Sequence, residues 1–294
     1  MYAGRSPQGR KARRRYSGSV LSLLALGSSL AWGTADFFAG VASRRRPAIA
    51  VVGWTQAAAL ALLTVLVLAG WGRGSASGWV WWSAGAGLAG MVGLLAFYTA
   101  LSTGTMGVVA PIAALGVIVP VILGVATGDQ PSAWAWVGMV IAILGVTLAS
   151  GPELSGAVSV RPVLLAGIAA VGFGLALFCL DRGARSSTLM TLWGMRVTSV
   201  TILLLVALFA RSVGGVRAAE VPGLTAIGLA DLAANALFAV ASSRGQVSVA
   251  SVLGSLYPVV TAVLARVVLD ERLRPVQYAG VSLAVAGAVV IGIG

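Results

Sequence analysis

The segment Leu88–Gly104, LAGMVGLLAFYTALSTG, recurs later in the chain at Leu229–Gly245 as LADLAANALFAVASSRG. The shift between the two is 141 residues (229 minus 88), and identical residues stand at 88/229, 89/230, 97/238, 100/241, 102/243 and 104/245. The same shift also pairs Gly33/Gly174, Ala35/Ala176, Phe37/Phe178, Arg44/Arg185 and Gly53/Gly194, and a shift of 142 then pairs Asp129/Glu271, Gly138/Gly280 and Gly145/Gly287. A repeat this long and this apolar predicts a duplicated transmembrane unit, an architecture found in many secondary transporters.

The composition excludes a water-soluble protein. Hydrophobic residues make up 59% of the 294 residues and charged residues 10%, against roughly 25% charged in soluble domains. Apolar segments of about 20 residues, long enough to cross a hydrocarbon layer of about 30 Å, recur along the chain. They lie near residues 19–42, 48–70, 79–101, 105–127, 133–150, 161–181, 188–210, 221–242, 246–268 and 276–294. The sequence therefore predicts an all-α integral membrane protein with ten transmembrane helices.

The two predicted repeats are residues 19–150 and 161–294, and each contains five of these segments. Because five is odd, the second repeat begins on the opposite face of the membrane, so the repeats are inverted around a central cavity. Residues 1–18 form a basic tail that we expect to be disordered, with cations at Arg5, Arg10, Lys11, Arg13, Arg14 and Arg15. Positive charge ahead of the first helix favours the cytoplasmic side. We therefore expect both termini on the cytoplasmic face of the plasma (inner) membrane.

The net charge of +12 would favour a nucleic-acid partner in a soluble protein. In this chain most cations lie in the tail or near the ends of apolar segments, where they meet lipid headgroups. We therefore expect the lipid bilayer as partner and no nucleic acid. The chain has no histidine and a single cysteine, Cys179, which argues against the usual zinc and haem sites, so we expect no cofactor and no metal.

Short motifs in both repeats resemble one transporter family. The first helix carries AWGTADFFAG at 31–40, followed by Ser43-Arg44-Arg45. The second repeat carries Leu256-Tyr257-Pro258-Val259, then LDERL at 269–273 and a glycine-rich last helix. These motifs, their order and the duplication resemble bacterial EamA-type transporters of the drug/metabolite transporter superfamily. The resemblance implies ten helices around a central cavity, alternating access, and transport of amino acids, metabolites, nucleotide sugars or drugs, with export in many bacterial members.

The chain departs from that family pattern in two places. Gly128-Asp129-Gln130 stands where a Gly-Glu pair is common, and Thr55-Gln56 stands in the second helix where an arginine often occurs. In the seventh predicted helix, Arg196 fills the corresponding place. These departures bear on the substrate more than on the fold.

Away from the ends of the predicted helices there are three charged residues, namely Asp36, Arg196 and Asp231. A charge at the centre of such a helix costs about 2.5 to 3.5 kcal/mol on insertion scales, so these residues are rarely incidental. Asp36 is a candidate for proton coupling or cation recognition, and the alternative is a carboxylate that snorkels or hydrogen bonds near the helix end. Arg196 and Asp231 are predicted to form an ion pair, either structural or opened by a zwitterionic substrate. Asn235 follows Asp231 by four residues and shares its helix face.

Further candidates for the substrate or coupling-ion pathway are Gln56, Trp32 and Tyr98, with core packing as the alternative for the two aromatic residues. A proline within a helix frees a carbonyl that lipid cannot satisfy, so such breaks generally face protein or a polar cavity. The corresponding parts of the two repeats contain such prolines, at Pro111, Pro120 and Pro258. We interpret them as helix breaks along the pathway, with simple kinks as the alternative.

These features favour a secondary active transporter that exports a small organic metabolite or drug by alternating access, with protons as candidate coupling ions. An importer of a sugar- or nucleoside-like solute is the alternative within transport, and a non-transporting membrane scaffold is the alternative from another class. An enzyme is not expected, since the helices carry neither clustered acids for a metal nor a Ser-Lys or Ser-His arrangement. The expected partners are the bilayer and a small-molecule substrate, with the protein a monomer or a homodimer.

Overall fold

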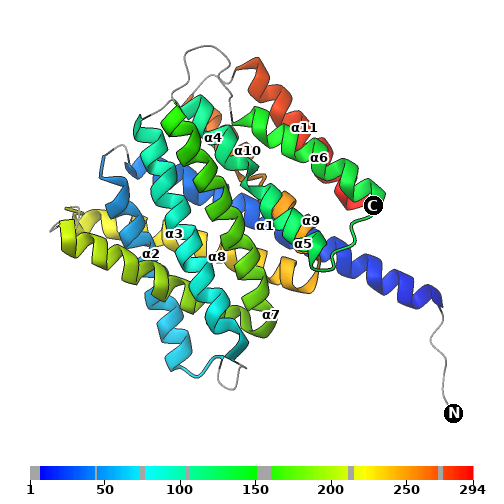
Figure 1. Cartoon of the computed structure of the whole chain (residues 1–294), viewed down its shortest axis with the longest axis horizontal. Helices are drawn as coiled ribbons and strands as arrows, with labels where there is room; N and C mark the ends of the chain where they lie inside the picture. The colour runs from blue at the N-terminus through cyan, green and yellow to red at the C-terminus, as the bar shows by residue number, and fades with distance from the viewer. Residues whose placement is uncertain are drawn as a thin grey trace.

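The computed structural model describes residues 7–43, 45–72, 77–103, 106–150, 160–210, 215–270 and 274–293. Within these ranges the chain forms helices joined by short connections, without a β-strand (Figure 1). The α-helices are α1 (Pro7–Ser43), α2 (Ala48–Leu68), α3 (Val80–Thr103), α4 (Met106–Ala114), α5 (Ile118–Ala126), α6 (Ala133–Ala149), α7 (Val160–Ala210), α8 (Val221–Arg244), α9 (Val247–Gly254), α10 (Tyr257–Val268) and α11 (Pro275–Ile293). Three 3-10 helices are η1 (Ser77–Trp79), η2 (Leu115–Val117) and η3 (Ala218–Glu220).

Seven helical segments in the described part of the chain are long and apolar enough to cross a membrane: Gly18–Ser43, Ile49–Leu68, Ser77–Phe97, Val160–Phe209, Ala218–Arg244, Val247–Val268 and Pro275–Ile293. Two shorter apolar helical segments are Ile112–Ala126 and Ala133–Ala149. Large apolar side chains lie exposed on these helices, among them Trp81, Leu204 and Val267, as expected of a surface that contacts lipid. The protein is therefore a multi-pass membrane protein.

Helix α7 contains 51 residues but is not continuous. Ser187 has φ −162° and ψ 111°, an extended backbone conformation within the helical run. The arm before Ser187 and the arm after it each exceed the about 20 residues that one crossing requires. These arms lie where the sequence predicts separate helices at 161–181 and 188–210.

Helix α1 begins at Pro7, whereas the sequence predicts a disordered tail as far as residue 18. The described part of the tail instead extends the first transmembrane helix, which projects beyond the helical bundle toward the N-terminus (Figure 1). Residues 7–18 are rich in arginine, with lysine, glutamine and alanine among them, and these residue types have high helix propensity, so the helix can continue beyond the apolar segment. Residues 1–6 lie outside the described ranges.

Two of the predicted membrane helices are interrupted at equivalent positions of the repeat. One consists of α4 and α5 with the 3-10 helix Leu115–Val117 between them. The other consists of α9 and α10, separated by a turn at Ser255 and Leu256. Leu256 follows Leu115 by the repeat shift of 141 residues (256 minus 115). Both repeats therefore break the same helix at the same place.

Two of the three prolines predicted to break helices lie in the first turn of a helix. Pro120 is the third residue of α5, and Pro258 is the second residue of α10. Backbone N–H groups in a first turn have no intrahelical partner, so proline removes no hydrogen bond there. Pro111 lies inside α4, but its side chain falls outside the described part of the structure.

The last helices of the two repeats, α6 and α11, pack against each other through glycines (Figure 1). A Cβ atom at Gly287 would lie 2.5 Å from the backbone nitrogen of Ala142, so only glycine permits this approach. Gly138 faces Gly287 and Gly145 faces Gly280, which makes the two helices antiparallel. The shift of 142 equates Gly138 with Gly280 and Gly145 with Gly287. Exchanging the repeats therefore leaves this set of contacts unchanged.

A second pair of helix contacts is also related by the repeat. A Cβ atom at Gly87 on α3 would meet Met195 and Thr198 on α7, and one at Gly228 on α8 would meet Thr55 on α2. Gly228 follows Gly87 by 141 residues, and residue 196 on α7 follows Thr55 by the same number. The buried core lies where these helices meet α1 and α9, with Phe238 completely buried.

Candidate functional site

Arg196 joins three helices in the interior of the bundle. It lies on α7 and is only 3% exposed. One of its terminal nitrogens donates to Oε1 of Gln56 on α2 at 2.5 Å, and the other lies 2.6 Å from Oδ2 of Asp231 on α8. A buried guanidinium is costly in a membrane unless it is paired, and these two acceptors stabilise its charge.

Asp231 is the more accessible member of the pair, because its side chain is 29% exposed. Asn235, one turn later on α8, donates from Nδ2 to the Asp231 backbone carbonyl at 2.8 Å and to Oδ1 at 3.2 Å. Asp231 therefore uses Oδ2 for the arginine and Oδ1 for the asparagine. The structure brings four predicted residues into contact, and we name Gln56, Arg196, Asp231 and Asn235 the central polar group.

Asp36 is exposed although it lies within a membrane helix. Residues advance about 100° around an α-helix, so Asp36 and the exposed Phe38 lie about 200° apart, on nearly opposite faces. Ala25 and Ser29 share the face of Asp36 to within about 20° by the same geometry. Both are buried against protein, at 0% and 3% exposure. Asp36 therefore lies on the face of α1 that is buried against protein earlier in the helix, while Phe38 faces outward.

Helices α8 and α10 both pack against α1. Asp36 interacts electrostatically with Asp231 on α8, and Tyr257 at the start of α10 interacts electrostatically with Asp36. Within the described part of the chain Asp36 has no hydrogen-bond or ion-pair partner. The carboxylate of Asp36 is therefore linked electrostatically to the central polar group, and no cation among the described residues pairs with it.

The other predicted pathway residues lie differently. Trp32 precedes Asp36 by one turn and packs on Phe238 of the core, with ring centroids 5.7 Å apart at 41°. The side chain of Tyr98 falls outside the described part of the structure, although its backbone belongs to α3. Among the described residues no three His, Cys, Asp or Glu side chains lie close enough to hold a metal ion.

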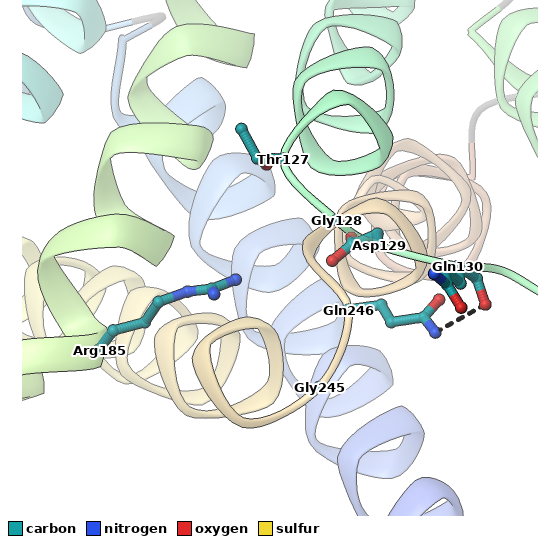
Figure 2. Close-up of a pocket in the computed structure, with 7 residues that line it drawn as sticks. All are labelled: Thr127, Gly128, Asp129, Gln130, Arg185, Gly245 and Gln246. Carbon is teal, nitrogen blue, oxygen red and sulfur yellow. Dashed lines mark hydrogen bonds between the residues drawn. The ribbon is translucent and has the colours of Figure 1, made fainter.

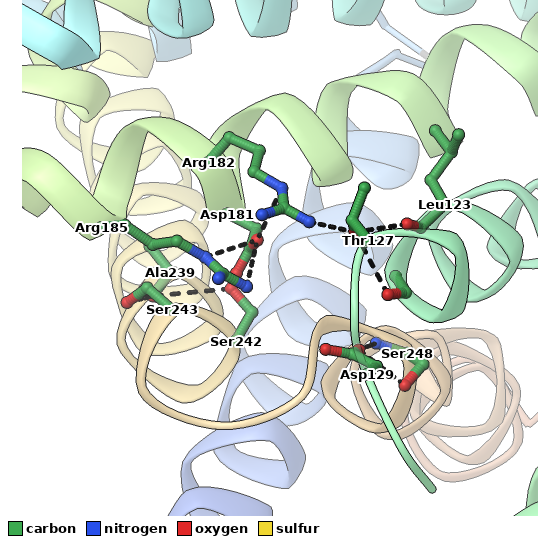
Figure 3. A network of polar contacts seen from close by, with 11 residues as sticks. Leu123, Thr127, Asp129, Asp181, Arg182, Arg185, Ala239, Ser242, Ser243 and Ser248 are labelled. Carbon is green, nitrogen blue, oxygen red and sulfur yellow. Dashed lines mark hydrogen bonds and ion pairs between the residues drawn. The ribbon is translucent and has the colours of Figure 1, made fainter.

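A second polar group, which the sequence does not single out, surrounds Asp181 on α7. This carboxylate is completely buried, 3.1 Å from a terminal nitrogen of Arg185 and 3.7 Å from Nε of Arg182 (Figure 3). Arg182 also lies over the ring of Phe178, 4.8 Å from its centroid. Asp181 falls at the end of a predicted segment, where a carboxylate is expected to be solvated. The closely spaced run Asp181-Arg182-Gly183-Ala184-Arg185 was the available signal, since it places two cations beside one acid.

The connection after α5 brings the first repeat to this group. Arg182 donates to the hydroxyl of Thr127, which in turn donates to the carbonyl of Leu123 (Figure 3). Gly128 follows with φ 112°, a conformation that favours glycine, and it turns the chain toward α9.

Asp129 and Gln130 complete the connection between the repeats. Oδ2 of Asp129 accepts hydrogen bonds from the backbone N–H and the hydroxyl of Ser248, both at 2.8 Å. Ser248 is the second residue of α9, so the carboxylate caps the start of that helix. Nε2 of Gln246 donates to the backbone carbonyl of Gln130 at 3.1 Å (Figure 2). We name these contacts, formed by Thr127, Asp129, Gln130, Arg182, Gln246 and Ser248, the cross-repeat cluster.

A polar pocket of about 510 Å³ lies beside the cross-repeat cluster (Figure 2). It is lined by Thr127, Gly128, Asp129, Gln130, Arg185, Gly245 and Gln246. The guanidinium of Arg185, whose side chain is 39% exposed, extends toward this pocket from α7. The pocket therefore lies between segments of both repeats and not within either one.

The sequence model of the EamA-like transporter family matches residues 20–151 and again residues 160–293. The two matches together cover almost the whole chain and coincide with its two internal repeats. The chain belongs to the EamA-like transporter family. Family membership makes this EamA protein a membrane transporter, in agreement with its apolar helices.

A solved crystal structure shares the fold of this EamA protein. The two superpose with a TM-score of 0.76 at 19% sequence identity, over 92% of this chain and 94% of the other. At that identity the similarity concerns the fold alone. No curated protein matches the sequence.

Proposed function

We propose that this EamA protein is a secondary active transporter that exports a small organic solute by alternating access, with protons as the coupling ion. The observation that carries the proposal is the carboxylate of Asp36, which lies within a membrane helix and interacts electrostatically with Asp231. A membrane scaffold would have no use for a charge in such a place, since intramembrane charges are costly and generally functional.

In this proposal the chain crosses the membrane ten times as two inverted repeats. The antiparallel packing of α6 on α11 supports inversion, because two equivalent helices related by an axis in the membrane plane run in opposite directions. The count of ten takes each arm of α7 as one crossing. It also takes α4 with α5 as one interrupted crossing, and α9 with α10 as another. Residues 19–150 and 161–294 are the proposed repeats, with both termini in the cytoplasm and the protein in the plasma (inner) membrane.

The cross-repeat cluster then closes the cytoplasmic end of the pathway. Asp129 follows four proposed crossings and Ser248 follows eight, so both lie on the face of the membrane that holds the N-terminus. Alternating access requires the repeats to separate at one end while they meet at the other. Asp36 lies seven residues before the opposite end of α1 at Ser43, about 10 Å along the helix axis, and it is accessible. These positions support a state closed toward the cytoplasm.

The proposal is tested by comparing metabolites inside and outside cells that express the protein, cells that lack it, and cells that express Asp36→Asn. We expect one or a few solutes to accumulate outside only with the unmodified protein. Asp270→Asn is the matched control, because the side chain of Asp270 is 92% exposed in a connecting segment. A solute that accumulates inside would make the protein an importer. Identical metabolite profiles in expressing and deficient cells would favour the scaffold.

A further inference from the structure

We infer that the polar pocket beside the cross-repeat cluster binds the headgroup of phosphatidylethanolamine, a membrane lipid whose headgroup carries a phosphate and a primary ammonium. The pocket has a volume of about 510 Å³, within the about 300–1,000 Å³ typical of sites for small molecules. None of its lining residues belongs to the central polar group. It is therefore a second site, and binding of the headgroup does not depend on transport.

Arg185 supplies the positive side of the pocket, toward which its guanidinium extends from α7 (Figure 2). Its Nε and Nη2 atoms contact Oδ2 of Asp181 at 3.2 and 3.1 Å, whereas Nη1 has no partner in the described structure. Asp181 is shared with Arg182, so two guanidinium groups against one carboxylate leave a net charge of +1. A phosphate oxygen at Nη1 would supply the missing negative charge through a charge-assisted hydrogen bond.

Across the pocket from Arg185, Asp129 and Gln246 offer hydrogen-bond acceptors (Figure 2). Oδ2 of Asp129 is occupied by Ser248, but Oδ1 has no hydrogen-bond partner among the described residues. The amide of Gln246 is also only half used, since Nε2 donates to the carbonyl of Gln130 while Oε1 is buried without a partner. An unpaired buried acceptor costs about 1–3 kcal/mol. A primary ammonium has three N–H donors, enough for both acceptors, and a charge that complements Asp129.

The two sides of the pocket together select a zwitterion. Arg185 disfavours a simple cation and Asp129 disfavours a simple anion, because each places a like charge beside the ligand. An ethanolamine phosphate carries both charges a few bonds apart and has N–H groups to donate. The trimethylated ammonium of phosphatidylcholine keeps the positive charge but has no N–H group, so the acceptors would remain unpaired.

The position of the pocket favours a lipid as the source of the zwitterion. Helix α5 ends at Ala126 and α8 ends at Arg244, and the connections that follow both helices line the pocket. The ends of membrane helices lie at the level of the lipid headgroups. Ile122 and Val125 are exposed on the last turns of α5, so an apolar surface suited to acyl chains leads to Thr127 at the pocket. A water-soluble zwitterion would make no use of that surface.

The lining of the pocket links its occupancy to the arrangement of the repeats. Thr127, Asp129 and Gln130 belong to the first repeat, whereas Arg185 and Gln246 belong to the second. A headgroup that contacts both Asp129 and Arg185 binds only while the repeats meet at this end, and it therefore stabilises that state. This consequence rests on the proposed alternating access, whereas binding itself does not.

The test compares three lipids with the same acyl chains: phosphatidylethanolamine, phosphatidylcholine, which lacks the N–H donors, and phosphatidylglycerol, which lacks the ammonium. Binding of each to the purified, delipidated full-length protein is measured by native mass spectrometry. We expect one phosphatidylethanolamine to bind at least about tenfold more tightly than the other two, as a hydrogen bond to a charged group implies.

Two variants locate the site. Asp129→Asn removes the charge but keeps an acceptor for Ser248, and Arg185→Gln removes the guanidinium, so each should abolish most of the preference for phosphatidylethanolamine. Arg244→Gln is the matched control and should retain it. Arg244 is an exposed cation next to Gly245 but does not line the pocket.

Equal binding of the three lipids, or an undiminished preference in Asp129→Asn and Arg185→Gln, would overturn the inference. An equal loss in Arg244→Gln would also overturn it, because headgroups would then respond to surface charge and not to the pocket. If a variant fails to fold, the comparison of lipids on the unmodified protein still decides. The water-soluble zwitterion β-alanine tests the source. A rise in melting temperature with β-alanine, without a preference for phosphatidylethanolamine, would refute the lipid.

The metabolite comparison separates this inference from the proposed function, because lipid binding is measured without transport. Export of a solute by a protein that shows no lipid preference would refute the headgroup site alone. A preference for phosphatidylethanolamine in a protein that changes no metabolite would support the site and refute transport alone.

Discussion

A single oxygen of Asp129 accepts two hydrogen bonds from Ser248, one from the backbone N–H and one from the hydroxyl, each 2.8 Å long. The two residues belong to different repeats and lie 119 positions apart in the chain. The carboxylate both caps helix α9 and ties the first repeat to the second. The contact must break if the repeats separate at this end of the protein.

We expect Asp129→Ala to loosen this end of the transporter. Loss of a helix cap costs about 0.5–2 kcal/mol, which is enough to shift a balance between two conformations. Ser251 can report whether this end opens, because it lies on α9 one turn after Ser248 and is completely buried. Its hydroxyl has no hydrogen-bond partner in the described structure, so its replacement breaks no hydrogen bond. We introduce Ser251→Cys into a protein whose native cysteine is replaced by Cys179→Ser. This cysteine should react faster with a maleimide added from the side proposed to be cytoplasmic when Asp129→Ala is also present.

Asp270→Asn serves as the control for this experiment, since it removes a carboxylate at the opposite end of the molecule. An unchanged reaction rate in Asp129→Ala would show that the contact with Ser248 does not hold the cytoplasmic end closed. Reaction from the outer side alone would show that the assigned orientation is wrong.

The buried carboxylate of Asp181 should be important for stability. Asp181→Ala leaves Arg182 and Arg185 without their shared partner, and removal of one member of a buried ion pair costs roughly 3–5 kcal/mol in soluble proteins. We expect a clear drop in the melting temperature of the purified protein in detergent. Because the side chain of Arg185 is 39% exposed, Arg185→Ala should lower the melting temperature less. Equal falls in melting temperature for the two variants would contradict the expectation that the buried Asp181 matters more than the partly exposed Arg185.

The packing of α6 on α11 offers a matched pair of glycines on one helix. A Cβ atom at Gly287 would lie 2.5 Å from the backbone of Ala142, whereas one at Gly292 would meet nothing within 4 Å. Gly287→Ala should therefore force the helices apart and lower both yield and melting temperature. Gly292→Ala should be neutral or slightly stabilising, because alanine has the higher helix propensity. Similar melting temperatures for the two variants would show that this interface tolerates separation.

The sequence predicts the helical architecture and one of the polar groups, and the reason is physical. A charge within an apolar segment stands out against its surroundings, and Arg196 and Asp231 lie in consecutive predicted helices, so their proximity could be anticipated. Asp181 could not be anticipated in the same way. It lies at the end of a predicted segment, and its burial depends on residues far away in the chain, such as Ser242 and the connection that contains Thr127.

The direction of Asp36 also required the structure. Its sequence position allowed both a carboxylate near the helix end and one that faces the interior, and only the burial of Ala25 and Ser29 identifies the inner face of α1. The sequence alone likewise does not show what Asp129, which departs from the family pattern, contacts. In the structure this residue contacts Ser248, which places the departure at a contact between the repeats.

The last prediction concerns Arg196 and Asp231, whose contact of 2.6 Å is consistent with a structural ion pair and with one that a substrate opens. If the pair is structural, Arg196→Ala and Asp231→Ala should each lower protein yield, because each leaves a charge in the interior without its partner. The cost of such a charge is roughly 3–5 kcal/mol in soluble proteins. The double substitution should recover part of the loss, and the difference measures the coupling between the two residues. Arg196→Ala should be the more harmful single change, because it also releases Gln56 and leaves Asp231 charged beside Asp36. Normal yield in all three variants, combined with weaker export, would instead identify a pair that opens to bind the substrate.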